Sequence, residues 1–334
     1  MGYAGTVSPS SRLSSTKKLS RRRTIVFLII MKKRGFSGIF CLPVTPFKGD
    51  EVDEESLRRV VEVIVRDGAD GLVPTGATGE FPYLLHEERK KIWGITLDVA
   101  NGKIPVTAGT GAVSTKEAIQ FTQEALDVGC DGVMLSHPIL MQANDDETYS
   151  HFAAVASKVD IPIIMYNNPG LGKSMSPSVI ERLGKEYDNI VSYKEDDFSH
   201  VRFAEIIRRN RDQITIFTGS PAAYLSFLTH GAHGALIAEF QAFPHLIKGV
   251  KESHEKGDQE KAVYYHEKIM KMFSIIGTYF VGASFWGRYK AIWRLRGLDI
   301  EFDVRAPCTP VTPQQLEKAK PEFMKLDIDD SWYV

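Results

Sequence analysis

The chain has 334 residues, of which 43% are hydrophobic and 25% are charged, and its formal net charge is -1. This composition is typical of a globular protein, and the near-neutral balance gives no basis for a nucleic-acid or acidic-polymer partner. Cys41, Cys130 and Cys308 lie far apart and form no C-x-x-C pair. The spacing therefore predicts neither a disulfide framework nor a thiolate metal site, and we expect reduced thiols in a cytoplasmic protein.

Residues 1–34 differ in composition from the rest of the chain. No acidic residue precedes Asp50, and the segment is rich in serine and arginine. Its apolar run at 24–31 is too short to span a membrane. The pattern resembles a transit peptide more than a signal peptide, and the first residues fit a loose myristoylation motif. A start of translation at or near Met31, or a disordered tail, explains it more simply, so this extension is left out of the fold prediction.

From residue 38 onward, short apolar runs alternate with segments of helical length. Eight runs bounded by turn residues are typical of buried strands: 38–44, 71–74, 104–109, 132–136, 161–166, 190–194, 214–219 and 234–238. Amphipathic segments between them predict helices, for example 54–67, 86–100, 115–128 and 147–158. Strands that alternate with helices predict right-handed β-α-β units and a parallel sheet.

A short repeat connects predicted helices to the strands that follow them. It reads GADG at 68–71, GCDG at 129–132 and GAHG at 231–234. The first glycine suits the left-handed residue after a helix, and the second lets the chain turn closely into a strand. One unit used repeatedly predicts a (β/α)8 TIM barrel over residues 35–257. A doubly wound open sheet is the alternative, but the GTGAVS at 109–114 has only two glycines of the phosphate-binding motif that this fold would need.

Residues 258–334 are expected to form a C-terminal helical extension. Helices are predicted over 258–276 and 283–296, and both carry aromatic side chains: Tyr264, Phe273, Phe285, Trp286, Tyr289 and Trp293. Aromatic stripes with this spacing are packing surfaces more often than cofactor sites. The extension is therefore expected to pack on the barrel or on another subunit.

Lys194 is the only lysine at the end of a predicted strand. In a barrel of this type the active site lies at the carboxyl ends of the strands. Burial there favours the neutral amine, which can attack a ketone and form a Schiff base. The acids that follow, Glu195, Asp196 and Asp197, favour the charged form instead, so an ordinary surface ion pair is the alternative interpretation.

Two further strand ends supply groups that suit a keto-acid. The GATGE at 76–80 offers small residues and backbone N–H groups before a helix, which favour a carboxylate, and Thr78 adds a hydroxyl. Tyr166 ends the strand at 161–166 and can transfer protons to and from a carbinolamine. Together with Lys194 these groups predict a site that holds a keto-acid by its carboxylate.

These motifs resemble those of a known family. GATGE, the YNNP at 166–169 and the YKEDD at 193–197 are similar to the G-T-T-G-E, Y-N-x-P and strand-six lysine motifs of the dihydrodipicolinate synthase / N-acetylneuraminate lyase family. The resemblance implies a (β/α)8 barrel with a C-terminal helical extension, assembled as a tetramer or dimer, that uses pyruvate without metal or organic cofactor. It also implies site residues: the Schiff-base Lys194, the proton-transferring Tyr166, a carboxylate site at Gly76, Ala77 and Thr78, and a pocket lined by Gly219 and Leu236.

The chain departs from both named enzymes in the second half of the site. The synthases have threonine at the position of Ala77, a tyrosine pair at Ile139 and Leu140, and arginine at Leu171. Those groups serve the proton relay and the carboxylate of the second substrate, so their replacement argues against true synthase activity. Leu171 resembles the neuraminate lyases, but their acidic pair is replaced by serine and proline at 220–221.

The pocket for the second substrate is expected to be shaped by Leu140 and Leu171, with Glu239, His137 and Asp197 as possible polar contacts. A carboxylate directly after a strand, such as Glu239, must face the barrel mouth or be paired. A single histidine before a proline, such as His137, is more often a structural loop residue.

The sequence thus favours a Schiff-base-forming lyase or aldolase that acts on pyruvate and an aldehyde, with no nucleic-acid or membrane partner. Three alternatives stay open. They are a 2-keto-3-deoxy-acid dehydratase that uses the same imine, a genuine 4-hydroxy-tetrahydrodipicolinate synthase, and a non-catalytic barrel that only binds a ligand. The presence of Lys194, Tyr166 and the carboxylate loop together favours an enzyme.

Overall fold

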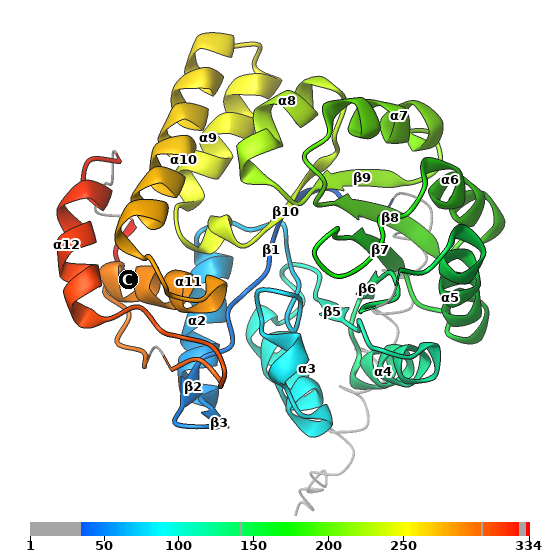
Figure 1. Ribbon diagram of the computed structural model, residues 1–334, viewed down its shortest axis with the longest axis horizontal. Coiled ribbons are helices and arrows are strands. Elements are labelled where there is room, and N and C mark those ends of the chain that lie inside the picture. The colour runs from blue at the N-terminus through cyan, green and yellow to red at the C-terminus, as the bar shows by residue number, and fades with distance from the viewer. Residues whose placement is uncertain (1–34, 141, 302, 327–331) are drawn as a thin grey trace, which may run out of the picture.

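The computed structural model describes residues 35–334 apart from 141, 302 and 327–331, so the predictions for residues 1–34 lie outside it. Within the described residues, eight parallel strands form a nearly closed barrel (Figure 1). Each coincides with one predicted run: β1 Gly38–Cys41, β4 Gly71–Leu72, β5 Thr107–Gly109, β6 Gly132–Ser136, β7 Ile163–Asn167, β8 Ile190–Glu195, β9 Thr215–Thr218 and β10 Gly234–Ile237.

The order of the strands confirms the barrel and excludes the open sheet. Hydrogen-bonded neighbours follow the order β4-β1-β10-β9-β8-β7-β6-β5. The two end strands, β4 and β5, meet through a parallel bridge between Leu72 and Val106, which closes the ring. The carboxyl ends of all eight strands therefore converge on one mouth, where Lys194 and Tyr166 are neighbours in register.

The helices between the strands surround the barrel (Figure 1). Their bounds are α2 Glu54–Arg66, α3 His86–Ala100, α4 Thr115–Val128, α5 Asp145–Lys158, α6 Pro177–Glu186, α7 His200–Asn210, α8 Tyr224–Thr229 and α9 Pro244–Glu255. Helix α2 illustrates why they form. The side chain of Asp53 accepts the N–H of Ser56 at the helix start, and Leu57, Val60 and Ile64 lie on one buried face.

The repeat performs two functions at the amino ends of the strands. Its first glycine has positive φ in every copy: 84° at Gly68, 103° at Gly129 and 99° at Gly231. Its third residue accepts a backbone N–H from the neighbouring strand region: Asp70 from Ile39 at 2.7 Å, Asp131 from Val106 at 2.9 Å and His233 from Ile216 at 3.0 Å. The glycine thus turns the chain, and the following polar side chain fixes the strand register.

Side chains alternate between the barrel interior and the helical layer, as the period of a strand requires. On β7, Ile164 and Tyr166 belong to the interior cluster, whereas Ile163 and Met165 pack outward against the helices. The interior cluster also contains Phe217 and the predicted pocket residue Leu236. The interior is therefore a packed core, and space for a ligand is confined to its mouth.

The C-terminal extension packs on the barrel. Its helices are α10 Gln259–Tyr279, α11 Phe285–Leu295 and α12 Pro313–Phe323, and they gather on one side of the barrel in Figure 1. The Nε1 of Trp293 donates to Gln241 at 2.9 Å, and the buried guanidinium of Arg296 contacts Asp67 at 2.7 Å. These contacts join α11 to both the start and the end of the barrel sequence.

Two features were not predicted, namely α12 and an antiparallel hairpin of β2 Phe47–Lys48 and β3 Glu51–Val52. Strands of two residues are too short to show a period in the sequence.

None of the helices in the described ranges combines the length and apolarity that a membrane crossing needs.

Candidate active site

Lys194 lies inside the barrel mouth, where the period of β8 places it. It pairs in register with Tyr166 on β7 and with Phe217 on β9. Only 5% of its side chain is exposed, and its Nζ lies 4.2 Å from the centre of the Tyr166 ring. Lys194 is thus a buried amine rather than a solvated surface charge.

The amine and the phenol share one carboxylate, that of Asp196. Nζ of Lys194 lies 3.3 Å from Oδ1 of Asp196, and the hydroxyl of Tyr166 donates to Oδ2 at 2.6 Å. Burial, and then the nearby charge of Asp196, hold the pKa of Tyr166 well above its usual value. The phenol therefore stays protonated and can donate.

Asn168, the third residue of YNNP, completes this network. Its Nδ2 donates to the Tyr166 oxygen at 2.7 Å and to Oδ2 of Asp196 at 3.2 Å. Its Oδ1 accepts the N–H of Gly170 at 2.8 Å. The amide orientation is therefore determined by the backbone, and it directs both donors toward the phenol and the carboxylate.

The other two acids after Lys194 face away from it. Glu195 is completely buried on the outer side of β8, where its carboxylate accepts from Tyr193, Asn167 and Arg202. Asp197, a predicted polar contact, lies 3.8 Å from Arg202 and belongs to this outer cluster. Of the three acids, only Asp196 reaches the amine, because residues 194 and 196 lie on the same face of the chain.

Gly219, which follows β9, makes room for the amine and the carboxylate. A Cβ at this position would lie 1.4 Å from Oδ1 of Asp196 and 2.4 Å from Cε of Lys194. The predicted pocket residue thus allows the charged pair to approach the backbone closely.

Gly219→Ala is expected to displace this pair and to lower the rate of keto-acid imine formation by about 100-fold, because a displacement near 1 Å has that effect on reacting groups. Borohydride trapping measures the rate. Gly94→Ala is the control, since a Cβ there meets nothing within 4 Å. Equal rates in Gly219→Ala and the wild type would show that the close approach is unimportant.

The GATGE loop forms the opposite wall of the mouth and is held in place by side chains of α11. Glu80 ends the loop in a left-handed conformation with φ of 61°, and its carboxylate pairs with Lys290 of α11 at 2.5 Å, with both side chains fully buried. The carbonyl oxygen of Ala77 accepts the N–H of Trp286 at 2.6 Å. Helix α11 therefore sets the position of the predicted carboxylate loop.

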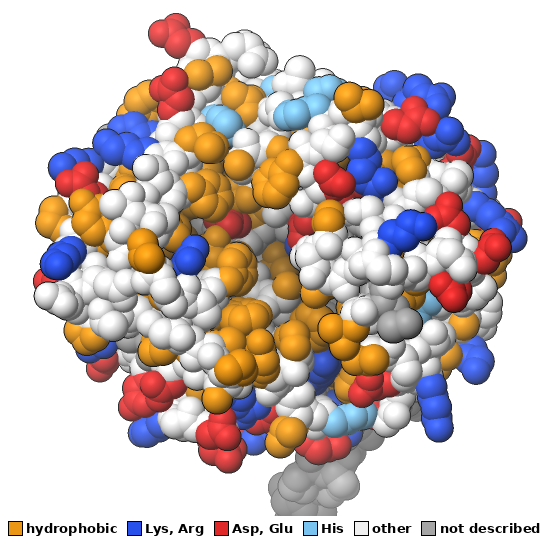
Figure 2. All heavy atoms as spheres, viewed as in Figure 1, with side chains coloured by type: hydrophobic (Ala, Val, Ile, Leu, Met, Phe, Trp, Pro, Cys, Tyr) orange, Lys and Arg blue, Asp and Glu red, His pale blue; other side chains and the backbone are white. Residues whose placement is uncertain are grey.

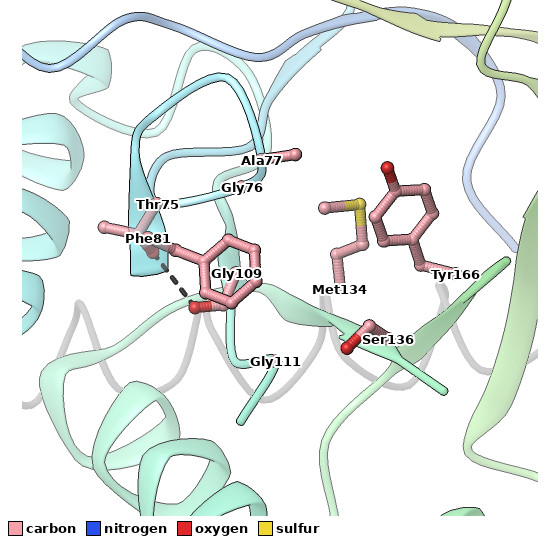
Figure 3. A pocket seen from close by; sticks show the side chains of 9 residues that line it. All are labelled: Thr75, Gly76, Ala77, Phe81, Gly109, Gly111, Met134, Ser136 and Tyr166. Carbon is pink, nitrogen blue, oxygen red and sulfur yellow. Dashed lines mark hydrogen bonds between the residues drawn. The ribbon is translucent and has the colours of Figure 1, made fainter. Parts of the chain in front are cut away.

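A pocket connects this loop to Tyr166 (Figure 3). Ala77 and the phenol ring lie on opposite sides of it, and Met134 and Ser136 come from β6 between them. The Oγ of Ser136 is buried without a hydrogen-bond partner. The molecular face seen in Figure 2 is hollowed near its centre, and hydrophobic side chains gather around the hollow.

The structure brings most of the predicted residues together, but not all. Gly76 and Ala77 line the pocket with Tyr166, and Leu171 packs against the interior cluster that contains Leu236. Thr78 is buried in the same loop. Leu140 lies apart from them, with 78% of its surface exposed.

His137 is buried in the loop after β6 and contacts the backbone. Its two ring nitrogens lie 3.0 Å from the carbonyl oxygens of Pro138 and Asn168. These contacts agree with a structural loop residue. They also connect the loop after β6 to the YNNP segment that positions Asn168.

Glu239 begins the short helix η3 Glu239–Gln241, which follows β10 after one residue, and it is buried. Tyr289 of α11 donates a hydrogen bond to its carboxylate. Burial raises the pKa of Glu239 to about 6, although the Tyr289 hydroxyl and Lys194 act in the opposite direction.

This shift predicts a pH-dependent stability. The folded carboxyl binds its proton more tightly than the unfolded one, so the wild type loses stability as the pH rises from about 4.5 to about 6. The amide in Glu239→Gln still accepts the hydrogen bond from Tyr289 but does not titrate. The free energy of unfolding of this variant, relative to that of the wild type, should therefore rise by about 1–2 kcal/mol when the pH is raised from 4.5 to 7. Urea unfolding at both pH values measures the difference, and a difference that does not change with pH would contradict the prediction.

Several residues of the site were not predicted, namely Asp196 in this role, Asn168, Ser136, Tyr289 and Trp286. The role of Asp196 could have been predicted from the sequence, since it lies two residues after Lys194 and shares its face. The roles of Tyr289 and Trp286 could not, because they depend on where α11 packs against the barrel. Within the described ranges, no three His, Cys, Asp or Glu side chains group in a way that could hold a metal ion.

The chain is similar to a known family and to its named members. The sequence profile of the Dihydrodipicolinate synthetase family matches residues 35–325. A 4-hydroxy-tetrahydrodipicolinate synthase of Syntrophus aciditrophicus is 35% identical over 286 residues, which cover 85% of this chain and 96% of the relative. The protein of that name from Aquifex aeolicus is 31% identical over 294 residues, which cover 88% and 98%.

Solved structures show the same architecture. The crystal structure of dihydrodipicolinate synthase from Aquifex aeolicus has a TM-score of 0.80 and 31% identity, and the match covers 87% of this chain and 98% of that one. YagE, a prophage protein of the dihydrodipicolinic acid synthase family from E. coli K12 in complex with pyruvate, has a TM-score of 0.83 and 25% identity, with 88% and 100% covered.

Fold, site and relatives together define the class of protein: this is an enzyme, a lyase of the class I aldolase type. Such enzymes use a lysine amine as their nucleophile. The chain belongs to the dihydrodipicolinate synthetase family.

Proposed function

We propose that the protein makes or breaks a carbon–carbon bond between pyruvate and an aldehyde through an imine on Lys194. The observation that carries this proposal is the position of Tyr166. Its hydroxyl belongs to the network of Lys194 and Asp196, and the same residue lines the pocket formed with Gly76 and Ala77. A keto-acid held at the loop would face Tyr166, whose ring centre lies 4.2 Å from the amine.

The reaction follows from these positions. The carboxylate of pyruvate binds the backbone N–H groups around Ala77 and Thr78. The neutral amine of Lys194 adds to the ketone carbon, and the carbinolamine loses water to give the imine. Loss of a methyl proton then gives an enamine, which attacks the aldehyde carbon while the aldehyde oxygen takes up a proton. Water then hydrolyses the imine and releases the product. Tyr166 transfers protons at the carbinolamine oxygen.

The second half of the site favours an aldehyde without a carboxylate near its reacting carbon. Ile139 and Leu140 stand where the synthases have a tyrosine pair. Leu171, which stands where the synthases have an arginine, packs against the apolar interior. These features disfavour a genuine 4-hydroxy-tetrahydrodipicolinate synthase.

Trapping tests the proposal directly. The wild-type protein is incubated with pyruvate and borohydride, and intact mass and peptide mapping locate the adduct. We expect a reduced pyruvate adduct on the peptide that contains Lys194. No adduct with pyruvate or with longer 2-keto-acids, in a folded sample, would overturn the proposal and favour a barrel that only binds a ligand.

Product analysis then separates the enzymes that share the imine. A panel of hydroxylated 2-keto-acids is offered to the protein, and released pyruvate is measured. A lyase releases pyruvate from its substrate, whereas a dehydratase forms the imine and releases none. The homotetramer or dimer stays a prediction from the resemblance, and light scattering of the purified protein tests it. The cytoplasmic location stays a prediction from the cysteine pattern.

A further inference from the structure

We propose that Asp196 is a catalytic residue, the proton acceptor and donor that serves both Lys194 and Tyr166 during imine formation. The inference rests on the proposed function, because it assigns a role within the same reaction. The chain has Ala77 and Ile139 where the synthases have the threonine and tyrosine of their proton relay. The Asp196 carboxylate would take over the proton transfer that those residues perform.

The geometry sets Asp196 apart from a simple counter-ion. One oxygen, Oδ1, lies 3.3 Å from Nζ of Lys194 and accepts no hydrogen bond. The other, Oδ2, accepts from the Tyr166 hydroxyl at 2.6 Å and from Asn168 at 3.2 Å. Each oxygen thus serves a different partner, so one carboxylate can exchange protons with both the amine and the phenol.

The backbone around Asp196 is built to admit it. A side chain on Gly219 would overlap Oδ1, as described above, so the carboxylate occupies space that only glycine leaves free. The N–H of Asp196 itself donates to the carbonyl oxygen of Asn167 at 3.1 Å, which extends the β7–β8 ladder beyond Lys194. Asp196 is therefore held by regular strand pairing and not by a loose loop.

The proton balance shows what the carboxylate contributes. Asp196 takes a proton from the Lys194 ammonium, which leaves the neutral amine to attack the ketone carbon. After addition, the ammonium proton of the adduct moves to the former ketone oxygen and gives the neutral carbinolamine. The carboxyl group of the acid form of Asp196 then turns so that its O–H faces the Tyr166 oxygen, and its proton passes through the Tyr166 hydroxyl to the carbinolamine oxygen, which departs as water. Asp196 ends as a carboxylate beside the protonated imine, so no external acid or base is consumed.

The other nearby carboxylates are poorly placed for this role. Glu239 interacts electrostatically with Lys194 and Asp196, but its hydrogen bond comes from Tyr289. Glu195 and Asp197 face the outer cluster around Arg202. Asp196 alone among these four contacts both the amine and the phenol.

Chemical rescue tests the inference. The rate of borohydride-trapped imine formation with pyruvate is measured for the wild type, Asp196→Asn, Asp196→Ala and the matched control Asp197→Asn, with and without formate. We expect both Asp196 variants to be slower by about 100-fold, within the usual range for general acid–base catalysis. Formate should raise the rate of Asp196→Ala at least about tenfold, because it fits the vacated space, and leave Asp196→Asn unchanged.

The outcomes separate this inference from the proposed function. If the wild type traps no keto-acid, the proposed function fails and this inference fails with it. If the wild type traps pyruvate and Asp196→Asn does so equally fast, Asp196 has no catalytic role while the imine chemistry stands. A slow Asp196→Ala variant that formate does not rescue, with an unchanged thermal midpoint, would make Asp196 a structural partner only. Should Asp196→Asn fail to fold, the rescue of Asp196→Ala decides.

Discussion

Lys194→Met is expected to abolish imine trapping and to lower kcat/KM by at least about 10⁴-fold, because it removes the buried amine that is the proposed nucleophile. Methionine has a similar length and can pack against the ring of Tyr166, which the Lys194 side chain contacts now. The loss should therefore be chemical and not a failure to fold. Trapping of pyruvate and turnover of the substrate found in the panel measure it.

The matched control is Lys158→Met, which removes an exposed lysine at the end of α5. It should keep the adduct, the activity and the thermal midpoint of the wild type. If Lys194→Met still carried a borohydride-stable pyruvate adduct in the active-site peptides, the nucleophile would be another group.

Lys290→Met is expected to give the largest loss of stability, about 3–5 kcal/mol in the free energy of unfolding, because it leaves the Glu80 carboxylate buried without its partner. Both side chains are fully buried. Burial raises the pKa of Glu80 and lowers that of Lys290 to about 8. Since Glu80 ends the GATGE loop, imine formation should fall as well. Urea unfolding and pyruvate trapping measure the two effects.

Two controls separate the cost of leaving a buried charge unpaired from the cost of removing any charged group. The double variant Glu80→Gln/Lys290→Met removes both charges and should recover part of the loss. Asp98→Asn breaks the exposed pair of Arg58 and Asp98, whose side chains are 44% and 66% exposed, and should cost less than about 1 kcal/mol. A similar cost for Lys290→Met and Asp98→Asn would contradict the role assigned to the buried pair.

Much of the fold could be predicted because its signals are local and repeated. The eight apolar runs, the amphipathic segments and the G-x-x-G repeat each depend on a few neighbouring residues, and all of the runs became strands of the barrel. Once the fold is a barrel, the strand ends are known to converge, so Lys194, Tyr166 and the GATGE loop could be assigned to one mouth. Leu140 shows the limit of this reasoning, since its side chain is exposed in a loop where its backbone is left-handed, with φ of 68°.

By itself, then, the sequence determined the barrel, its strand ends and the position of a buried amine, because strand period and helix period are set by the backbone. Only the tertiary structure decided that one carboxylate serves both that amine and a phenol. The spacing of two residues places Asp196 on the face of Lys194, whereas the pairing of β8 with β7 brings Tyr166 within hydrogen-bond distance of the same carboxylate. The support of the carboxylate loop by Trp286 and Lys290 was likewise decided by packing, because α11 lies more than 200 residues away along the chain.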